Sequence, residues 1–337
     1  MPRVPADWEP QKAIWIAWPH RRSTWPGRFE TIAPTFRRFI QSVADCVPAR
    51  IIGSADLRAV AKFAHSNATW LEIATDDCWI RDYGPLFVDD ADPYAVDWTF
   101  NAWGGKYPPW ELDNAAGSKI IDAAHWRRVN GRLCLEGGAM EWDGGGRLLT
   151  TDCLLTPSRT PGASKEQIAD RLHEVTGTNE IVWVNGGGLA GDDTDGHIDQ
   201  LARFVDRENV VVAVSDPDDE NHTGLESNFE ILKRWGNATA PQVEVHRLPI
   251  PPARHVEGQR VPESYCNYLR LGNDRLLVPT FGDRDADDVA IGILGDLARL
   301  RAPSIEVLGV DCRDLVWGLG ALHCASLNEP AIVNAAV

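Results

Sequence analysis

Residues 164–176 read SKEQIADRLHEVT, and EIVWV follows at residues 180–184. Ser164 and Gln167 have the spacing of a capping box, which marks the start of a helix. Apolar residues then recur at helical spacing on one face: Ile168, Leu172 and Val175. The run EIVWV is short and rich in β-branched residues, as is typical of a strand. The stretch therefore predicts one amphipathic helix followed directly by one strand.

This helix-and-strand unit recurs along the chain. Further helices are predicted near five segments: 28–46, 54–66, 111–125, 224–235 and 285–301. Further strands are predicted in nine short runs: 13–18, 50–53, 85–88, 94–98, 147–151, 209–214, 243–248, 275–279 and 305–309. The five helices from 54–66 onward begin roughly 50–65 residues apart, a period typical of repeated supersecondary units. Because no linker or change in composition divides residues 1–337, we predict a single α/β domain of about five modules.

Charge and composition narrow the classes of function. The chain has 337 residues with 49 acidic and 33 basic side chains, a formal net charge of −16. That charge argues against binding to nucleic acid or an anionic membrane and is compatible with a small cationic ligand. No run approaches the ~18 apolar residues of a membrane span, and the N-terminal residues contain no apolar signal-peptide core. The seven scattered cysteines, without a C-x-x-C pair, suit a reducing cytoplasm, where we expect the protein to reside.

Three motifs invite other interpretations. NGGGLAG (185–191) contains a G-x-G-x-x-G pattern, but acidic residues follow where a dinucleotide site needs a helix N-terminus. An EF-hand loop in this region would need carboxylates at Gly191 and Ala202. His197 and Asp199 could both bind zinc, yet no H-E-x-x-H or H-x-x-E-H pattern accompanies them. We therefore expect no metal and no organic cofactor, with a metal-dependent hydrolase as an alternative.

Four separate stretches combine reactive side chains with glycine. They are DDCWIRDYGP (76–85), LEGGAMEWDGGG (135–146), DDTDGHID (192–199) and GLGALHCASLNEP (318–330). A cysteine, a histidine, a glutamate and two aspartates from them could act jointly: Cys324, His197, Glu136, Asp82 and Asp199. If residues 198–204 form a strand, His197 and Asp199 share one face of it. Such a set supplies a nucleophile, an acid/base, its orienting partner and a clamp for a cation.

Each of these residues also has a purely structural interpretation. Asp82 could pair with Arg81, and Glu136 could cap a turn. His197 could be a hydrogen-bonded loop residue, and Cys324 could be one more buried thiol. Their combination on separate loops favours the functional interpretation.

An ordered series of motifs runs nearly from end to end of the chain: PADWEPQKAIWIAWP, WIRDYGP, EGG, LLTTDCLL, GDDTDGHID, SYCNYLR, VPTFGD and GALHC. With this series the chain resembles the agmatine deiminase and bacterial peptidylarginine deiminase family, within the guanidino-group modifying superfamily. The resemblance implies a pentein-type fold, a pseudo-symmetric α/β propeller of five modules around a central polar channel. It implies that Asp82 and Asp199 bind the substrate guanidinium. By the same resemblance, His197 is the general acid/base, Glu136 its partner and Cys324 the nucleophile.

The resemblance implies a cysteine-dependent deiminase that converts agmatine to N-carbamoylputrescine and ammonia through a covalent thiouronium, a step in polyamine biosynthesis. It requires no cofactor and is compatible with a homodimer. Asp193 is a candidate to bind the far amine of the substrate, although Asp192, Asp193 and Asp195 could instead structure their loop. The chain departs from the family pattern at residues 326–328 and at Tyr83. These departures leave another guanidino compound, or peptidyl arginine, as alternative substrates.

Overall fold

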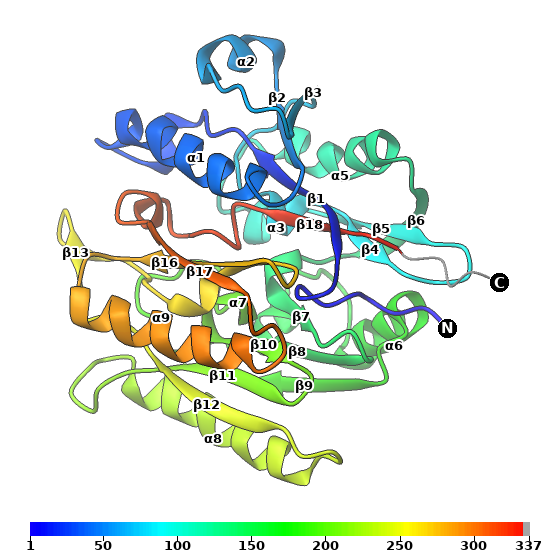
Figure 1. The fold of residues 1–337 in the computed structure, drawn as a ribbon. Helices are drawn as coiled ribbons and strands as arrows, with labels where there is room; N and C mark the ends of the chain where they lie inside the picture. The colour runs from blue at the N-terminus through cyan, green and yellow to red at the C-terminus, as the bar shows by residue number, and fades with distance from the viewer. Residues whose placement is uncertain (333–337) are drawn as a thin grey trace.

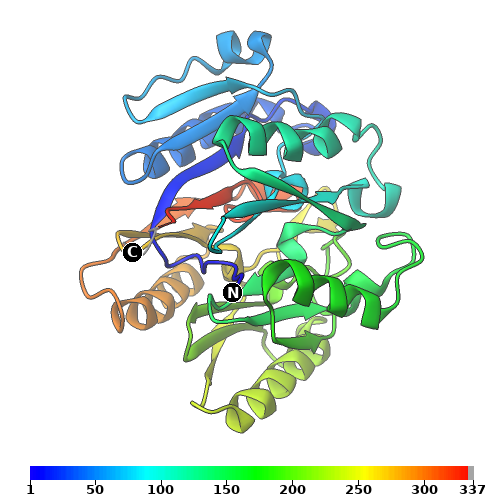
Figure 2. The same ribbon diagram turned by 90° about the vertical axis from the view of Figure 1, so that its right-hand side faces the viewer.

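Five small sheets of three or four strands are arranged in a ring, each with one long helix on its outer side, and β13 (His255–Val256) and β14 (Gln259–Arg260) form a separate two-stranded sheet. The structure is a computed structural model, which describes residues 1–332. Figure 1 shows the long helices α1, α5, α6, α8 and α9 at the periphery, and the view turned by 90° in Figure 2 shows the sheets enclosed between them. Each sheet with its helix is one module of a repeated unit.

Four modules are continuous segments with the same connectivity. In each, two strands pair antiparallel, a helix follows, and the third strand pairs parallel to the second. A parallel pair needs a long crossover, which the helix provides.

The second module is β4 (Leu86–Val88), β5 (Tyr94–Thr99), α5 (Glu111–Ala124) and β6 (Arg127–Cys134). The third is β7 (Met140–Trp142), β8 (Arg147–Thr151), α6 (Lys165–Thr176) and β9 (Glu180–Val184). The fourth is β10 (Ala202–Asp206), β11 (Asn209–Val214), α8 (His222–Ala238) and β12 (Glu244–Pro249). The fifth is β15 (Leu269–Leu271), β16 (Arg275–Thr280), α9 (Arg284–Arg299) and β17 (Glu306–Asp311).

The first module is assembled from both ends of the chain. Its elements are β18 (Leu327–Pro330), β1 (Gln11–Ala17), α1 (Phe29–Ala44), β2 (Ala49–Gly53), α2 (Ala55–Ala61) and β3 (Ala68–Glu72). β18 pairs antiparallel with β1, and β2 pairs parallel to β1 beyond the α1 crossover, so this sheet closes the ring. α2 leads to β3, an additional parallel strand. The prediction that the helix at 54–66 opens the series of five is therefore wrong, because α1 is the equivalent helix.

The helix α6 shows how closely local sequence can define an element. Ser164 Oγ accepts a hydrogen bond from the Gln167 amide, and Gln167 Oε1 accepts one from the Ser164 amide. Gly177, at φ 68°, ends the helix in a left-handed conformation that glycine adopts without strain. Ile168 and Leu172 are fully buried. The predicted capping box and apolar face are thus confirmed.

The ten strands predicted from the short β-rich runs are all present, and several strands that the sequence did not predict are very short. β7 and β15 have 3 residues each and β18 has 4, too few for a two-residue period to show. The expectation of a strand at 198–204 is wrong in its first half. Residues Ile198–Leu201 form the short helix α7, and β10 begins only at Ala202. A helical turn, and not the alternation of a strand, therefore places His197 and Asp199.

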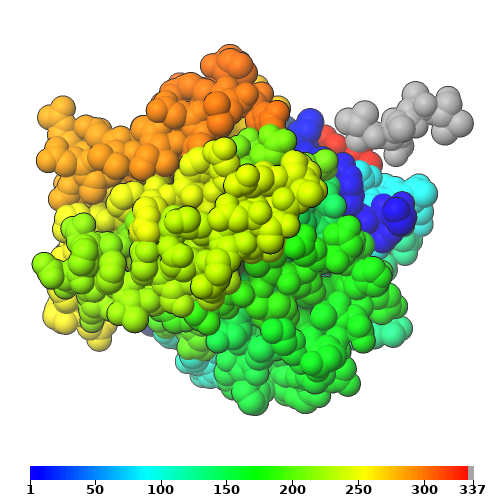
Figure 3. All heavy atoms as spheres, turned by 90° about the horizontal axis from the view of Figure 1, so that it is seen from below, coloured from blue at the N-terminus to red at the C-terminus, as the bar shows by residue number. Residues whose placement is uncertain are grey.

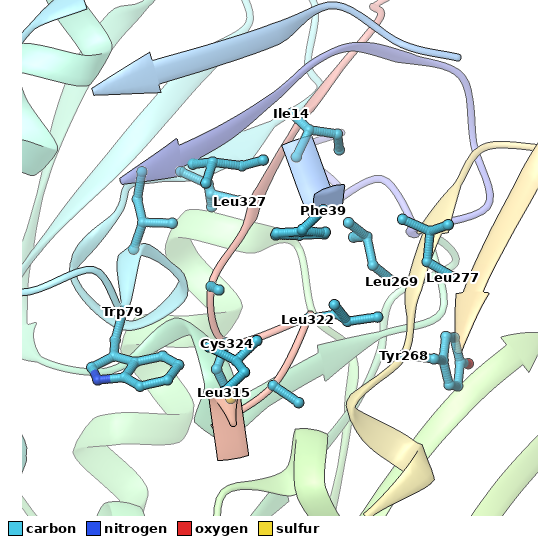
Figure 4. Close-up of a cluster of buried hydrophobic side chains, with 14 of the residues drawn as sticks. Ile14, Phe39, Trp79, Tyr268, Leu269, Leu277, Leu315, Leu322, Cys324 and Leu327 are labelled. Carbon is cyan, nitrogen blue, oxygen red and sulfur yellow. The ribbon is translucent and has the colours of Figure 1, made fainter. Parts of the chain in front are cut away.

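A large apolar core joins the first, second, fourth and fifth modules, and two smaller clusters join the third module to the second and the fourth. Figure 4 shows part of the large core, with Ile14, Phe39 and Leu277 packed in a cluster that also contains Cys324. Figure 3 shows α8 and β12 covering much of the lower face of the molecule. No helix within residues 1–332 has the length and apolarity needed to cross a membrane.

Candidate active site

Each module begins with a short helical turn just before its first strand, and these turns meet inside the ring. In module order they are residues 322–325, α3 (Ile80–Tyr83), η2 (Gly137–Ala139), α7 (Ile198–Leu201) and η4 (Tyr265–Asn267). The Arg81 amide donates to the Cys324 carbonyl at 3.3 Å, which joins the first turn to the second. Residues of η2 contact α3 and α7, and α7 contacts η4. The repeat of the fold therefore brings five distant stretches of sequence to one place.

The structure brings the five predicted site residues together on these turns. Asp82 lies in α3, Glu136 directly precedes η2, His197 and Asp199 lie at the start of α7, and Cys324 lies in the first turn. A cavity of about 360 Å³ is lined by Asp82 and Cys324. Three tryptophans also line it: Trp79, Trp103 and Trp317. A cavity with aromatic and charged residues in its wall thus reaches Asp82 and Cys324.

His197 is fully buried with a carboxylate at each ring nitrogen. Nε2 lies 2.8 Å from Glu136 Oε2, and Nδ1 lies 3.5 Å from Asp82 Oδ1. Burial alone would lower the pKa of His197, but the charges of Asp82 and Glu136 outweigh it and raise the pKa to about 9. The imidazole is therefore protonated at neutral pH and can donate a proton.

The two aspartates have different partners. Asp82 Oδ1 accepts a hydrogen bond from the Gly138 amide at 2.9 Å, and Oδ2 accepts one from Trp103 Nε1 at 3.0 Å. Burial, with the nearby charge of Asp199 contributing, raises the pKa of Asp82 to about 6. Asp199 Oδ2 lies 2.8 Å from His323 Nδ1. Although burial opposes it, this hydrogen bond holds the pKa of Asp199 below its usual value.

The backbone of residue 138 lies directly against the charged groups of the site, which requires a residue without a side chain there. A Cβ at Gly138 would lie 2.6 Å from Asp82 Oδ1 and 2.7 Å from His197 Nδ1. Within residues 1–332, Asp199 Oδ1 and His197 Nδ1 are buried without a hydrogen-bond partner. Buried polar atoms are normally paired, so these atoms point to a polar ligand that completes the site.

The thiol of Cys324 faces the aspartates. Its Sγ lies 3.5 Å from Asp199 Oδ2 and 3.0 Å from Asn267 Nδ2. Burial and the negative charges of Asp199 and Asp82 raise the pKa of Cys324 well above its usual value. The sulfur is therefore a neutral thiol until positive charge enters the cavity.

The three other aspartates in the loop before α7, Asp192, Asp193 and Asp195, have different contacts. Asp192 accepts hydrogen bonds from the amides of Thr194 and Gly196, so it structures the loop, as its alternative interpretation held. Asp195 pairs with Lys106 and Arg159. Asp193 lines the cavity and accepts a hydrogen bond from the Tyr107 hydroxyl. Of the three, Asp193 is thus the acid available to a ligand.

The positions that depart from the family pattern lie outside the cavity. Ser326 Oγ donates to the Leu322 carbonyl at 2.7 Å, and Asn328 Oδ1 accepts from Arg81 at 2.6 Å. The alternative pairing of Arg81 with Asp82 is therefore wrong. Tyr83 is buried, and its hydroxyl donates to the Asp77 carbonyl. These departures do not alter the cavity wall directly.

Sequence reasoning missed several residues that support the site. Arg159 is buried, pairs with Glu136 and donates to the Thr194 carbonyl, which ties the loop before α7 to the partner of His197. His323 stands next to Cys324 in GALHC, and Asn267 belongs to SYCNYLR, so both lay within motifs that carried the resemblance. No local pattern identified Arg159. Within residues 1–332, no group of three or more His, Cys, Asp and Glu side chains is placed to hold a metal ion.

Comparison with known proteins agrees with this architecture. Residues 3–330 match the Porphyromonas-type peptidyl-arginine deiminase family. The chain is 34% identical over 361 residues to the agmatine deiminase of Pseudomonas aeruginosa (strain LESB58), with 98% of this chain and 95% of the relative covered. A substrate-bound structure of a cysteine-to-serine variant of C. jejuni agmatine deiminase superposes with a TM-score of 0.88 at 30% identity, covering 99% and 98% of the two chains.

A more distant structure extends the agreement to the fold. A dimethylarginine dimethylaminohydrolase superposes with a TM-score of 0.55 at 15% identity, covering 94% of this chain and 99% of that chain. This likeness concerns the fold alone, and with the five sheets it confirms the pentein-type architecture. The chain belongs to the Porphyromonas-type peptidyl-arginine deiminase family, whose deiminases are hydrolases of guanidino carbon–nitrogen bonds.

Proposed function

We propose that the protein is a cysteine-dependent deiminase that hydrolyses agmatine to N-carbamoylputrescine and ammonia. The observation that carries the proposal is the buried thiol of Cys324, which lines the cavity together with the buried Asp82 and lies 3.5 Å from the buried Asp199. The single imidazolium of His197 does not balance the buried carboxylates of Asp82 and Asp199, and a guanidinium would supply the further positive charge. The name of the similar proteins from Pseudomonas aeruginosa and C. jejuni supports the same substrate.

A guanidinium fits this site by geometry and by charge. It is planar, stays protonated, and presents a fork of N–H donors that match carboxylate oxygens. Asp82 and Asp199 lie on different turns, and the unpartnered Oδ1 of Asp199 can accept one of these donors. When the cation is bound, its charge offsets that of the carboxylates and lowers the pKa of Cys324. Substrate binding would thus help to form the thiolate nucleophile.

The reaction then follows from the arrangement of groups. The thiolate of Cys324 attacks the central carbon, and protonated His197 gives its proton to the leaving nitrogen, so that ammonia departs. The S-alkylthiouronium that remains is attacked by water, from which His197 takes a proton. Collapse of this second adduct breaks the carbon–sulfur bond and releases the ureido product. Glu136, at 2.8 Å from His197 Nε2, stabilises the imidazolium throughout.

The far end of the substrate lies among both acids and bases. Asp193 and Asp77 line the cavity and could receive the primary amine of agmatine. Arg21 and Lys106 also line it, and they could receive the carboxylate of free arginine instead. Free arginine and peptidyl arginine are therefore the competing substrates, and a metal-dependent hydrolase is the competing mechanism.

Turnover of defined guanidines tests the proposal. The purified protein is incubated with agmatine, arginine and an arginine peptide, with and without chelator, and ammonia and ureido product are measured. We expect agmatine to be the best substrate, chelator to have no effect, and Cys324→Ala to abolish turnover. Cys312→Ala is the matched control, because Cys312 is also buried but does not line the cavity. The proposal fails if none of the guanidines is turned over or if Cys324→Ala keeps full activity.

The remaining predictions concern the whole chain. We propose that residues 1–337 form one catalytic domain. A cytoplasmic location and a homodimer stay predictions from the sequence.

A further inference from the structure

The fifth module also supplies a residue to the centre of the ring. The turns of the other four modules carry Cys324, Asp82, Glu136, and the pair His197 and Asp199. The equivalent turn of the fifth module is η4, which ends at Asn267 just before β15. The mechanism above gives this turn no task, although it packs against α7.

Hydrogen bonds fix the orientation of the Asn267 amide. Asn267 is fully buried, and its Oδ1 accepts from the backbone amides of His323 at 3.1 Å and Cys324 at 3.2 Å. Backbone N–H groups can only donate, so the oxygen of the side chain must face them. The NH₂ group therefore faces Cys324 Sγ, at 3.0 Å from Nδ2.

The turn that carries Asn267 is itself held in place. Ser264 Oγ accepts from the Cys266 amide at 3.2 Å and donates to the Gln200 carbonyl of α7 at 2.6 Å. The His323 amide donates to the Asn267 carbonyl as well, at 3.2 Å. Asn267 is thus fixed relative to both α7 and the turn of Cys324.

The surroundings of the sulfur make this contact important. Burial favours the neutral thiol of Cys324 over the thiolate, and the negative charges of Asp199 and Asp82 act in the same direction. Within residues 1–332, Asn267 is the one side chain that donates a hydrogen bond to Sγ. An N–H donor that points at sulfur favours the thiolate over the thiol.

We propose that Asn267 is a further catalytic residue, whose amide stabilises the negative charge on Cys324 Sγ. It acts when the thiolate forms for attack on the guanidinium carbon, and again when the thiolate leaves as the second adduct collapses. No atom is transferred to or from Asn267 in either step. The inference rests on the proposed function for its place in the reaction, but the contact itself acts on the free thiol.

The test measures the thiol directly. The rate of Cys324 alkylation by iodoacetamide is followed against pH without substrate, in the Cys312→Ala background and against a Cys324→Ala blank. Asn267→Asp keeps an oxygen for the two backbone amides and replaces the donor at Sγ with a carboxylate oxygen. We expect it to move the alkylation midpoint upward by at least one pH unit and to lower kcat by roughly 10–100-fold, the range for a hydrogen bond to a charged group.

Two further variants separate this role from a structural one. Asn228→Asp is the matched control, because Asn228 is a fully buried asparagine that bonds only the backbone of Asn185. It should leave the midpoint and kcat unchanged. If Asn267→Asp does not fold, Asn267→Ser is used instead, because the shorter serine side chain cannot reach both the backbone amides and Sγ. Asn267→Ser must also raise the midpoint of Cys324 alkylation.

The outcomes are distinguishable from those of the proposed function. A folded Asn267 variant with the wild-type midpoint overturns the inference, whatever the substrate. A raised midpoint in a protein that turns over none of the guanidines supports the thiolate contact and overturns the deiminase proposal instead.

Discussion

Asp82 and Asp199 occupy equivalent places in two modules, yet they carry their charge differently. Each lies in the short helical turn before the first strand of its module, and each is buried. The pKa of Asp82 is raised to about 6, whereas that of Asp199 is lowered. The repeat of the fold therefore determines where a carboxylate lies, and the neighbours of each carboxylate determine its protonation.

The difference has a specific structural cause. Asp199 is hydrogen-bonded to His323, whose other ring nitrogen lies 3.3 Å from Asp7, and Arg203 lies nearby with Nη2 2.8 Å from Asp7. Asp82 receives only a backbone amide and an indole N–H besides its contact with His197. Asp199 is thus charged before substrate arrives, while the charge on Asp82 is costly until a cation reaches it.

Neutralising each aspartate in turn should give the largest effect on activity, and it tests the difference between Asp82 and Asp199 most directly. We expect Asp199→Asn to lower kcat/KM for agmatine by roughly 10³-fold, because a buried cation would lose its permanent counter-charge. Asp82→Asn should cost less, roughly 10²-fold, because that substitution also relieves repulsion between carboxylates. Steady-state kinetics measure both, and Asp206→Asn, a buried aspartate of β10 outside the cavity, should retain full activity. Equal losses would mean that the two carboxylates are interchangeable.

The pH profile should show which aspartate limits activity at acidic pH. Below a pKa of about 6, Asp82 is protonated and can no longer bind a guanidinium as a carboxylate. We expect kcat/KM to fall roughly 10-fold per pH unit below this value. At the alkaline end, activity should fall as His197 loses its proton near pH 9. Asp82→Asn should remove the acidic limb and move the alkaline limb to lower pH, because the charge of Asp82 helps to raise the pKa of His197. An unchanged acidic limb would assign it to another group.

Asp82 and Asp199 should change the pH dependence of the free energy of unfolding in opposite directions. Because the folded-state pKa of Asp82 is raised from 3.8 to about 6, the folded protein holds the proton more tightly than the unfolded chain in that window. Wild-type stability is therefore lost as pH rises from about 4 to 6, by roughly 2 kcal/mol from this group. The stability of Asp82→Asn should not show this loss between pH 4 and 6, because asparagine does not titrate. Urea unfolding of both proteins at pH 4 and pH 7 measures the difference.

Asp199 gives the opposite sign. Its lowered pKa means that its charged form stabilises the folded state above the unfolded pKa of 3.8, and that this contribution is lost as pH falls below that value. Asp199→Asn should therefore be less stable than wild type at pH 7 in the same urea experiment. A variant more stable than wild type at pH 7 would contradict the role given to His323.

These contrasts also show what the sequence could and could not predict. Module helices such as α6 were predictable because their caps and apolar faces are local. The five candidate site residues could be selected from the sequence because each stands in a recognisable motif, and the structure brings them together. Arg159, by contrast, reaches the site from the long segment between β8 and α6, where nothing local distinguishes it from a surface arginine.

The protonation of the site could not be predicted from the sequence. Both aspartates follow the same kind of motif, a polar residue in a turn before a strand. The donors that distinguish them come from residues 21 positions away for Asp82 and 124 positions away for Asp199. Only the closed ring places Trp103 and His323 against them.

The smallest effect should come from the indole that supports Asp82. Trp103→Phe removes the Nε1 donor, which lies 3.0 Å from Asp82 Oδ2, and keeps an aromatic ring in the cavity wall. Loss of a donor to the charged form should raise the pKa of Asp82 further. We expect the acidic limb of kcat/KM to move upward by about one pH unit, with a several-fold loss at pH 6 and little change at pH 8.

Trp317→Phe is the matched control for that variant. Trp317 lines the same cavity, but its Nε1 donates to the Pro26 carbonyl at 2.9 Å instead of to an aspartate. Both substitutions remove one buried indole N–H and a similar aromatic area. Only Trp103→Phe should move the acidic limb, because only Trp103 supports a carboxylate. If both variants shift it equally, the protonation of Asp82 depends on the cavity as a whole, and its contrast with Asp199 does not arise from individual hydrogen bonds.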